Sequence, residues 1–456
     1  MFGRKKKKKS VNPLEMGPDV EFKATGAASD QENQANAIQA RQSPGIAPTK
    51  VLVAQAMDQN ANRVLVDYTA QGVAIRFDVD GFWHNLPSMD RKVGDVMLAV
   101  MKKLANLDPA DRRSRQAGEF KVTYRRVLRT CQITTQGVET GERVIIRVVD
   151  PKQEQMSLED LGMRESMAYQ FMERVGRATG EEEAKPPTGI YVLSAPANGG
   201  GLSSLWAAGL MATDRYTGDF LGIEEKTRRE PEVENVDVQE FDESQGEKAA
   251  DIVPKMMLRQ PDVFTVPHIA DKETLDTLCM VAETEGIVTI TSVRAKSAAE
   301  ALNKLLSAST NKSSFIKFIN LVVNMRLVRR LCEECKVPFQ PSPAILQQLQ
   351  LPPERIQVLY QEYQPPPVDP QAPKNKKNAP PPVCPNCGGL GYSGRIGIFE
   401  MLIVDDNIRQ ALAQQSAVDV LHQLAAKTGM RSLREEGIGI LAQGITSIPE
   451  LQRALQ

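Results

Sequence analysis

The chain has 456 residues, which is too long for one hydrophobic core and predicts two to four domains. Hydrophobic residues make up 41% of it and charged residues 25%, as in ordinary globular proteins. A formal net charge of -1 excludes an overall electrostatic bias towards nucleic acid, so we expect no nucleic-acid partner. No apolar stretch approaches the roughly 18 to 20 residues that a membrane span needs, and we expect a cytoplasmic protein.

Residues 1–50 lack hydrophobic periodicity and are rich in Ala, Gln, Asn, Pro and Gly. Such a composition buries too little apolar surface to offset the entropy lost on ordering, which predicts a disordered basic tail. The run Lys5–Lys9 has no apolar segment behind it, so we do not expect a secretory signal. The lysines either touch anionic lipid or the acidic face of a partner, or they stay solvated.

Residues 51–155 have the pattern of a small α+β half-domain. Apolar patterning predicts strands at 64–68, 73–79, 120–128 and 143–149. Asp80-Gly81 has the chemistry of a two-residue hairpin turn. Apolar residues at helical spacing predict a helix over residues 93–105, and a charged helical connector follows over residues 156–185.

Strand and helix patterns alternate over residues 186–331, which predicts a parallel sheet flanked by helices. A continuous apolar run at 189–194 is typical of a fully buried strand, and a glycine turn leads from it into a helix predicted at 203–212. The acidic stretch 229–247 is expected to form a surface excursion from this domain. At the end of the chain, residues 401–456 predict amphipathic helices separated by glycines.

Residues 332–400 carry two Cys-x2-Cys pairs, made by Cys332, Cys335, Cys384 and Cys387. In a reducing compartment such pairs favour a metal over disulfides. Four thiolates at about 2.3 Å fill a tetrahedral Zn²⁺ site and leave no open position, so we predict a structural zinc. A Pro-rich insertion at 361–382 separates the pairs, but the cost of closing a loop grows only logarithmically with its length. Free thiols or a redox pair are the alternative.

The glycine turn after the buried strand has the scaffold of a phosphate cradle, in which backbone N–H groups at a helix N-terminus meet an anion. Its candidate ligands are Asn198, Gly199, Gly200, Gly201, Ser203 and Ser204. The alternative is a plain strand–helix turn that binds nothing.

A working phosphate loop reads GxxxxGK[ST], with the lysine on the β- and γ-phosphates and the hydroxyl on Mg²⁺. In one alignment Gly201 replaces the lysine and Leu202 replaces the hydroxyl residue. In the other, Leu202 replaces the lysine and Ser203 restores the hydroxyl. No lysine occurs from Pro186 to Glu225, so no near neighbour substitutes for it.

Several segments resemble, in the right order, those of the ATPases that drive type II secretion and type IV pilus assembly. They lie at residues 80–81, 107–113, 141–147, 324–335, 384–400, 429–437 and 444–446. The resemblance implies that residues 186–331 form a RecA-like P-loop domain, with ATP and Mg²⁺ as its ligands. It also implies homo- or hetero-hexameric rings that act on an inner-membrane platform protein, which would hold the chain at the periphery of the inner membrane.

The same resemblance shows where this chain departs from the family. The family's acidic motif follows Leu-Arg-Gln, and Leu258–Asp262 is kept here. His268 then stands where a carboxylate is expected to organise Mg²⁺ and water, and Ala270 stands where an arginine is expected. Only Asp271 remains of that motif, and we expect it to contact the nucleotide.

Three further positions bear on the predicted nucleotide site. The family's histidine-bearing motif is replaced around Arg294, and residues 132–135 lack the arginine that the family presents to a neighbouring subunit. The acidic pair Glu224-Glu225 is kept, and we expect Glu224 to contact the nucleotide.

Phosphoryl transfer depends almost wholly on positioned charge, and losing one such donor costs about 10² to 10³ in rate. The sequence therefore predicts a hydrolysis-deficient structural or regulatory subunit that binds nucleotide weakly. One alternative is an active ATPase with a lysine from elsewhere, such as Lys185 or Lys226. A second is a zinc-stabilised interaction module that binds no nucleotide.

Overall fold

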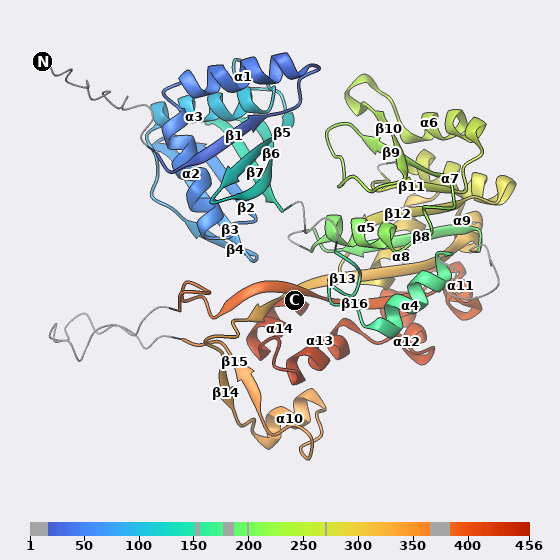
Figure 1. Cartoon of the computed structure of the whole chain (residues 1–456). Coiled ribbons are helices and arrows are strands. Elements are labelled where there is room, and N and C mark those ends of the chain that lie inside the picture. The colour runs from blue at the N-terminus through green and yellow to red at the C-terminus, as the bar shows by residue number, and fades with distance from the viewer. Residues whose placement is uncertain (1–16, 151–155, 177–186, 198–199, 270, 365–383) are drawn as a thin grey trace, which may run out of the picture. The chain divides into compact units, whose positions relative to one another are not determined.

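The computed structural model describes residues 17–150, 156–176, 187–197, 200–269, 271–364 and 384–456 (Figure 1). The chain separates into two compact units, Met1–Gln153 and Glu154–Gln456. In these described ranges, no helix is both long enough and apolar enough to cross a bilayer.

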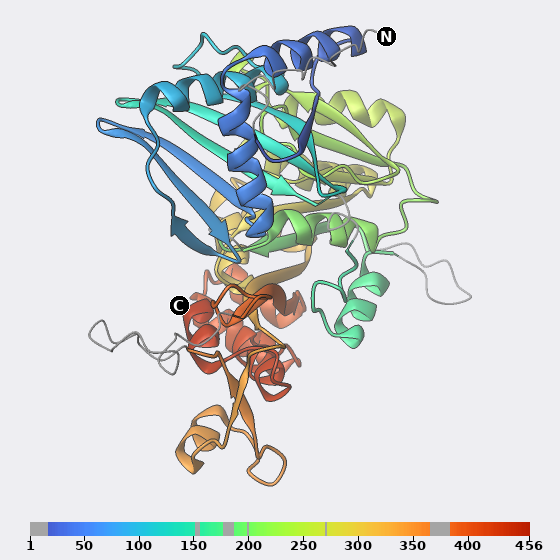
Figure 2. The same ribbon diagram turned by 60° about the vertical axis from the view of Figure 1, so that its left-hand side comes forward.

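The first unit is built on an antiparallel sheet of seven strands in the order β1-β5-β6-β7-β2-β3-β4. Its strands are β1 (Val20–Ala24), β2 (Arg63–Thr69), β3 (Gly72–Val79), β4 (Phe82–Asn85), β5 (Gln116–Tyr124), β6 (Val127–Val138) and β7 (Gly141–Val149). Its helices are α1 (Asp30–Gln42), α2 (Ile46–Asp58) and α3 (Arg91–Leu104). The helices share one hydrophobic core with the sheet, and Figure 2 shows them lying together over it.

The prediction of a disordered tail over residues 1–50 was wrong for residues 20–50. Strand β1 pairs with β5 and turns alternate side chains into the core. Helix α1 lacks a visible apolar stripe because it buries only Asn36 and Ala40, so its pattern does not stand out in the sequence. Residues 1–16, with the lysine run, lie outside the described residues.

The strand predicted over residues 120–128 is divided in two. Strand β5 ends at Tyr124 and β6 begins at Val127. Between them Arg125 and Arg126 both have left-handed backbones, with φ of 48° and 66°. Such a turn usually uses Asn-Gly or Asp-Gly, so no turn signal is visible in this sequence.

The second unit contains a seven-stranded sheet in the order β10-β9-β11-β12-β8-β13-β16, parallel except for β16 against β13. Its strands are β8 (Gly189–Ala195), β9 (Phe220–Glu225), β10 (Val236–Phe241), β11 (Val263–Val266), β12 (Val288–Arg294), β13 (Ile319–Leu331) and β16 (Tyr392–Ile403). The helices around it are α4 (Glu165–Arg174), α5 (Leu202–Met211), α6 (Ala249–Met256), α7 (Lys272–Glu285), α8 (Ala298–Ala308) and α9 (Lys312–Phe318). The predicted parallel sheet flanked by helices is therefore confirmed.

Strand β8 is buried on both faces, as its continuous apolar run predicts. Tyr191 and Leu193 pack in one hydrophobic cluster with α5, while Ile190 and Val192 pack in another with α7 and α8. Strand β8 thus lies inside the sheet with a helical layer on each side. The acidic stretch 229–247, expected as an excursion, contains the edge strand β10.

The C-terminal part of the second unit continues from the long antiparallel pair β13 and β16. A small sheet of β14 (Val337–Phe339) and β15 (Leu359–Gln361), with helix α10 (Pro343–Leu349), projects from it in both views (Figures 1 and 2). The predicted C-terminal helices are α11 (Asp406–Ala413), α12 (Val418–Lys427), α13 (Leu433–Ala442) and α14 (Ile448–Leu455). Residues 365–383, most of the predicted Pro-rich insertion, lie outside the described residues.

Candidate functional site

Four parallel strands of the second unit end at one edge of the sheet, which we call the carboxyl edge. Their last residues are Ala195 (β8), Glu225 (β9), Val266 (β11) and Arg294 (β12). In open α/β sheets, ligands bind outside the carboxyl ends of the strands. The described residues that were predicted to contact nucleotide all lie in or just after these strands, namely Gly200, Gly201, Ser203, Ser204, Glu224 and Asp271. So do Leu202, His268 and Arg294, the described positions at which this chain departs from the family's catalytic residues. Asn198, Gly199 and Ala270 lie outside the described residues.

The glycine turn between β8 and α5 has no room for side chains at Gly200 and Gly201. Gly201 has a left-handed backbone, with φ of 78°, and forms the N-cap of α5 without a side-chain cap. A Cβ atom there would lie 2.7 Å from Cε of Met325 and 2.9 Å from Cδ1 of Leu327. A Cβ atom on Gly200 would lie 2.5 Å from the Pro196 carbonyl oxygen. Gly200 therefore requires glycine for steric reasons, whereas Gly201 requires it chiefly for its left-handed backbone, with Met325 and Leu327 crowding any side chain there.

Leu202, the first residue of α5, points into the protein. It is only 2% exposed and belongs to the hydrophobic cluster under α5. Ser203 is half-buried and Ser204 is exposed, so hydroxyl groups remain near the start of the helix. Both positions that the phosphate-loop lysine could occupy are thus a crowded glycine and a core leucine.

Arg294 brings a positive charge to the turn from the neighbouring strand. Strands β12 and β8 are in parallel register, with Arg294 beside Ala195. The exposed guanidinium donates a hydrogen bond from Nη1 to the Pro196 carbonyl oxygen at 3.3 Å. Lys304 donates from Nζ to the Arg294 carbonyl oxygen at 2.8 Å, which ties the end of β12 to α8.

The carboxylates of Glu224 and Glu225 end strand β9 and are both buried. Burial raises the pKa of Glu224 to about 7, although a hydrogen bond from the Glu230 backbone N–H to Oε2, at 3.0 Å, opposes the rise. Glu225 accepts hydrogen bonds at Oε2 from the Thr227 backbone N–H (2.9 Å) and hydroxyl (2.7 Å). Both carboxylates of the retained acidic pair therefore accept hydrogen bonds from the segment that follows β9.

His268 contacts a carboxylate that the sequence analysis did not single out. Its Nε2 lies 3.0 Å from Oε1 of Glu230, whose side chain is only 6% exposed. The other oxygen of Glu230, Oε2, has no hydrogen-bond partner among the described residues. Glu230 lies in the acidic stretch after β9, and only the tertiary fold brings it to the loop after β11.

Asp271 acts as the N-cap of helix α7. It accepts hydrogen bonds from the Thr274 backbone N–H at Oδ1 and from the Thr274 hydroxyl at Oδ2, both at 2.8 Å. This arrangement satisfies N–H groups that the first turn of a helix leaves unpaired. The carboxylate predicted to contact nucleotide therefore has a structural role in α7.

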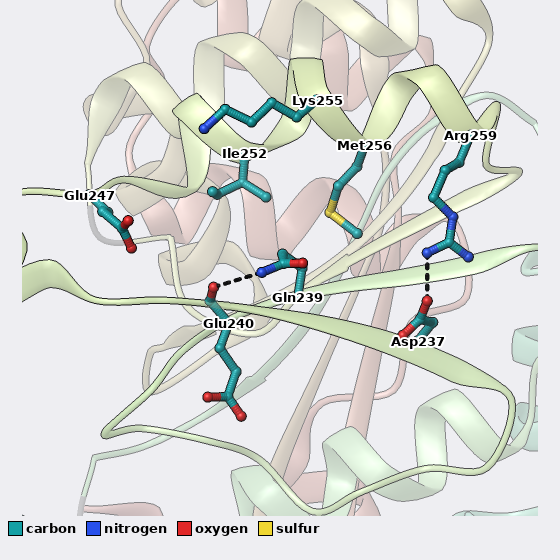
Figure 3. Close-up of a pocket in the computed structure, with 8 residues that line it drawn as sticks. All are labelled: Asp237, Gln239, Glu240, Glu247, Ile252, Lys255, Met256 and Arg259. Carbon is teal, nitrogen blue, oxygen red and sulfur yellow. Dashed lines mark hydrogen bonds and ion pairs between the residues drawn. The ribbon is translucent and has the colours of Figure 1, made fainter.

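A separate pocket of about 420 Å³ lies between the edge strand β10 and helix α6 (Figure 3). Arg259 reaches across it to Asp237 with Nη1 2.5 Å from Oδ2, and Gln239 donates from Nε2 to the Glu240 carbonyl oxygen at 3.1 Å. Strands β9, β11 and β12 separate β10 from β8 in the sheet. The pocket is therefore distinct from the glycine turn after β8, and it contains none of the residues predicted to contact nucleotide or metal.

The four cysteines of the two Cys-x2-Cys pairs come together at one point. Their sulfur atoms all lie within 4.8 Å of one another, and they form the only such cluster of possible metal ligands in the part of the chain described here. Cys332 Sγ is 3.8 Å from Cys384 Sγ, and Cys335 Sγ is 3.6 Å from Cys387 Sγ. A tetrahedral ion with bonds of about 2.3 Å requires sulfur–sulfur distances of about 3.8 Å, so the geometry fits Zn²⁺.

Backbone and side-chain donors surround this cysteine cluster. Asn386 donates from Nδ2 to Cys332 Sγ and the Gly391 backbone N–H donates to Cys387 Sγ, both at 3.3 Å. Such donors stabilise the negative charge of thiolates and orient them towards a metal. The residues present are therefore suited to hold a tetrahedral ion with no open coordination position.

Comparison with known proteins identifies the family. Residues 39–453 match the family described as Type II/IV secretion system protein. The chain is 26% identical over 404 residues to the type IV pilus assembly ATPase PilB of Thermus thermophilus, covering 88% of this chain and 42% of that protein. It is 25% identical over 410 residues to the type II secretion system protein E of Pseudomonas aeruginosa, covering 90% of this chain and 75% of that protein.

Solved structures show the same fold. The Legionella pneumophila ATPase DotB matches with a TM-score of 0.54 at 12% identity, covering 88% of this chain and 93% of that chain. The pilus retraction motor PilT with bound ADP matches with a TM-score of 0.52 at 14% identity, covering 88% of this chain and 95% of that chain. The family match spans most of the sequence, and the fold agrees with it. The chain therefore belongs to the family of type II and type IV secretion system ATPase-like proteins.

Proposed function

We propose that this chain is a hydrolysis-deficient, structural or regulatory subunit of a type II secretion or type IV pilus assembly machine. The observation that carries the proposal is the shape of the turn after β8. Gly201 has no space for a side chain, and Leu202 is buried in the core. The turn therefore carries no lysine for the phosphates, and the packing at both positions disfavours one.

The remaining groups of the site support the same function. His268 takes the place of a carboxylate and pairs with Glu230, while Asp271 caps α7. Mg²⁺ is normally held by carboxylates and phosphates, and phosphoryl transfer needs that charge in position. Backbone N–H groups at residues 200–204, together with Ser203 and Ser204, would still bind ATP weakly. Several losses at one site bring hydrolysis to background even if their effects are not additive.

Family membership supports the proposed setting of the chain. It would join homo- or hetero-hexameric rings with other members of the family and act on an inner-membrane platform protein. We place it in the cytoplasm, peripheral at the inner membrane, and assign it no nucleic-acid partner. In a mixed ring, an intact paralogue would supply the hydrolysis.

Zinc has a structural role in this proposal. The four cysteines would provide all four ligands, and the ion would then have no position for a substrate or a water. The ion would hold the two chain segments that carry the Cys-x2-Cys pairs together.

Steady-state ATP hydrolysis by the full-length chain tests the proposal, with Ser203→Ala as the matched variant. We expect phosphate release at the same background rate from both proteins with Mg²⁺ present. Release by the wild type that clearly exceeds release by Ser203→Ala would overturn the proposal. A shift in melting temperature on adding ATP, with no turnover, would separate it from a module that binds no nucleotide.

An active ATPase is the second candidate, because Lys226 is exposed directly after β9 at the carboxyl edge. Lys185, the other candidate lysine, lies outside the described residues. If the wild type hydrolyses ATP and Lys226→Gln abolishes this, the active-ATPase function replaces the one proposed. If turnover survives Lys226→Gln, the catalytic cation lies elsewhere.

A further inference from the structure

The first unit has a groove beside its edge strand β1. Among the described residues, β5 is the only strand that pairs with β1 (Figure 1). Side chains of a strand point alternately to its two faces, so a groove lined by consecutive strand residues follows the edge of that strand. An edge leaves a row of backbone N–H and C=O groups unpaired, which another extended chain can use. The groove has a volume of about 810 Å³, and its lining from the sheet consists of Glu21 to Thr25 on β1 with Lys121, Thr123 and Leu128 on β5 and β6.

Two lysines lie opposite each other in this groove. Lys23 and Lys121 are direct partners in the antiparallel register of β1 and β5, and like charges at such positions destabilise a sheet. Neither ammonium group, nor the guanidinium of Arg41 on α1, has an ion-pair partner among the described residues. These three cations outnumber the two carboxylates that line the groove, Glu21 and Asp30. A negatively charged ligand would therefore relieve the repulsion between the lysines.

Helix α1 forms the other wall of the groove. It buries only Asn36 and Ala40, and Asn36 donates from Nδ2 to Oδ1 of Asn106 at 3.2 Å. Ala37 is half-buried and packs against the core of the first unit, on the same side of the sheet as Phe22. The wall therefore combines polar groups with a small apolar surface. The residues of α1 that line the groove follow one face of the helix, namely Asp30, Asn33, Gln34, Ala37 and Arg41.

We infer that this groove binds an extended acidic segment of a partner protein, which adds to the sheet as a strand beside β1. Every second residue of the segment would then carry a carboxylate on the face of Lys23 and Lys121, and the residues between them would be apolar and face Ala37. Such a segment keeps its carboxylates away from Asp30 on the α1 side, whereas a flat anionic surface would meet Asp30 as well. The surface lies in the first unit, so the inference goes beyond the proposed function and holds whether or not the chain hydrolyses ATP.

Fluorescence anisotropy of a labelled peptide of alternating glutamate and valine, titrated with the full-length chain, tests the inference. We expect saturable binding that weakens as the salt concentration rises. Lys23→Gln and Lys121→Gln should each weaken it about two- to fivefold, and the double variant about tenfold, because each change removes one exposed ion pair. The double variant Lys23→Glu/Lys121→Glu should instead prefer a peptide of alternating lysine and valine. Lys92→Gln, which removes an exposed charge on α3 outside the groove, should bind as the wild type does.

Peptides with an altered order or backbone test the addition of a strand. A peptide of the same composition, with its glutamates in one block and its valines in another, should not bind. The backbone N–H groups of alternate residues in a strand point to opposite edges. Methyl groups on the backbone nitrogens of the valines therefore block one edge of the peptide, and those on the glutamates block the other. One of these two peptides should lose binding and the other should keep it.

The inference is wrong if the wild type does not bind the alternating peptide, if the Lys23→Gln/Lys121→Gln variant binds it equally well, or if the two methylated peptides bind alike. Two other occupants of the groove would also contradict it. Self-association in sedimentation that the double variant loses would make the groove an interface between copies of this chain. Binding to phosphatidylglycerol vesicles, in place of the peptide, that the double variant loses would make it a lipid site. Melting curves of each variant show whether a loss of binding is a loss of fold.

Discussion

Nε2 of His268 lies 3.0 Å from Oε1 of Glu230, and this contact joins the loop after β11 to the segment after β9. The family resemblance leads one to expect a carboxylate at position 268, free to organise Mg²⁺ and water. In this chain the position carries an imidazole that pairs with a buried carboxylate instead. At the carboxyl edge, the Glu230 carboxylate thus pairs with the His268 imidazole, and position 268 offers no carboxylate to hold a metal ion.

Stability should depend on pH through Glu224. Burial raises the pKa of this carboxyl from 4.5 to about 7, so the folded protein binds its proton more tightly than the unfolded chain does. The resulting stabilisation is complete below pH 4.5 and is lost as the pH rises through about 7, with a loss of at most about 3 kcal/mol. Denaturant unfolding of the wild type and Glu224→Gln at pH 5 and pH 8 measures this loss of stability.

The wild type should lose stability relative to Glu224→Gln between these two pH values. The same series in a His268→Gln background repeats the measurement without the imidazole that contacts Glu230. Parallel pH profiles of the wild type and Glu224→Gln in both backgrounds would show that Glu224 titrates normally.

Gly201→Ala should destabilise the protein more than Gly246→Ala does. Both glycines have left-handed backbones, with φ of 78° and 80°, so each alanine costs about 1 kcal/mol for the conformation. A Cβ at 246 meets nothing within 4 Å, whereas one at 201 collides with Met325 and Leu327. We expect an additional 1 to 3 kcal/mol, roughly, at position 201 from crowding. Equal losses in denaturant unfolding would mean that the turn has room for a side chain.

Asp271→Ala should lower stability by about 1 kcal/mol, the usual cost of removing an N-cap. The Thr274 contacts of this carboxylate explain the loss. ATP affinity, measured by calorimetry, should not change. A weakened affinity with little loss of stability would restore Asp271 to the nucleotide site that the sequence predicts.

Removal of one cysteine ligand should release the metal and weaken the C-terminal helices. The Cys332 backbone N–H donates to the Gly391 carbonyl oxygen at 2.9 Å, and the Leu331 N–H donates to that of Ile445 at 2.8 Å, so the cluster is linked to the segment before α14. Elemental analysis should find about one zinc per chain in the wild type. Cys387→Ser should lose the metal and melt at a lower temperature.

Cys131→Ser is the control for this experiment, because Cys131 is buried in the hydrophobic core of the first unit, whereas the four clustered cysteines belong to the second. It should retain zinc in full. A wild type free of zinc, or a Cys387→Ser protein that keeps it, would contradict the structural zinc.

Elements with a strong local signal could be predicted, and those that depend on distant contacts could not. Strand β8 was visible as a continuous apolar run because both of its faces are buried. Strand β10 was hidden in an acidic stretch because it lies at the sheet edge, where most of its side chains are exposed or half-buried. Helix α1 buries too few side chains for its pattern to stand out.

The same distinction holds for the site. The cysteine spacing predicted that the four cysteines come together, and the missing lysine was visible in the sequence of the turn. The contact of Glu230 with His268 joins residues that follow different strands, so the spacing of residues in the sequence could not predict it. The crowding of Gly201 by Met325 and Leu327 depends on β13, more than 120 residues further along the chain.

Single-turnover hydrolysis tests the central claim most directly, with the protein in large excess over γ-labelled ATP and with Mg²⁺ present. Under these conditions one slow event per site is detected and a contaminating ATPase is revealed by comparison with Ser203→Ala. The account predicts phosphate release no faster than in buffer alone. A release phase that scales with the occupied fraction of the protein and disappears in Ser203→Ala would contradict it.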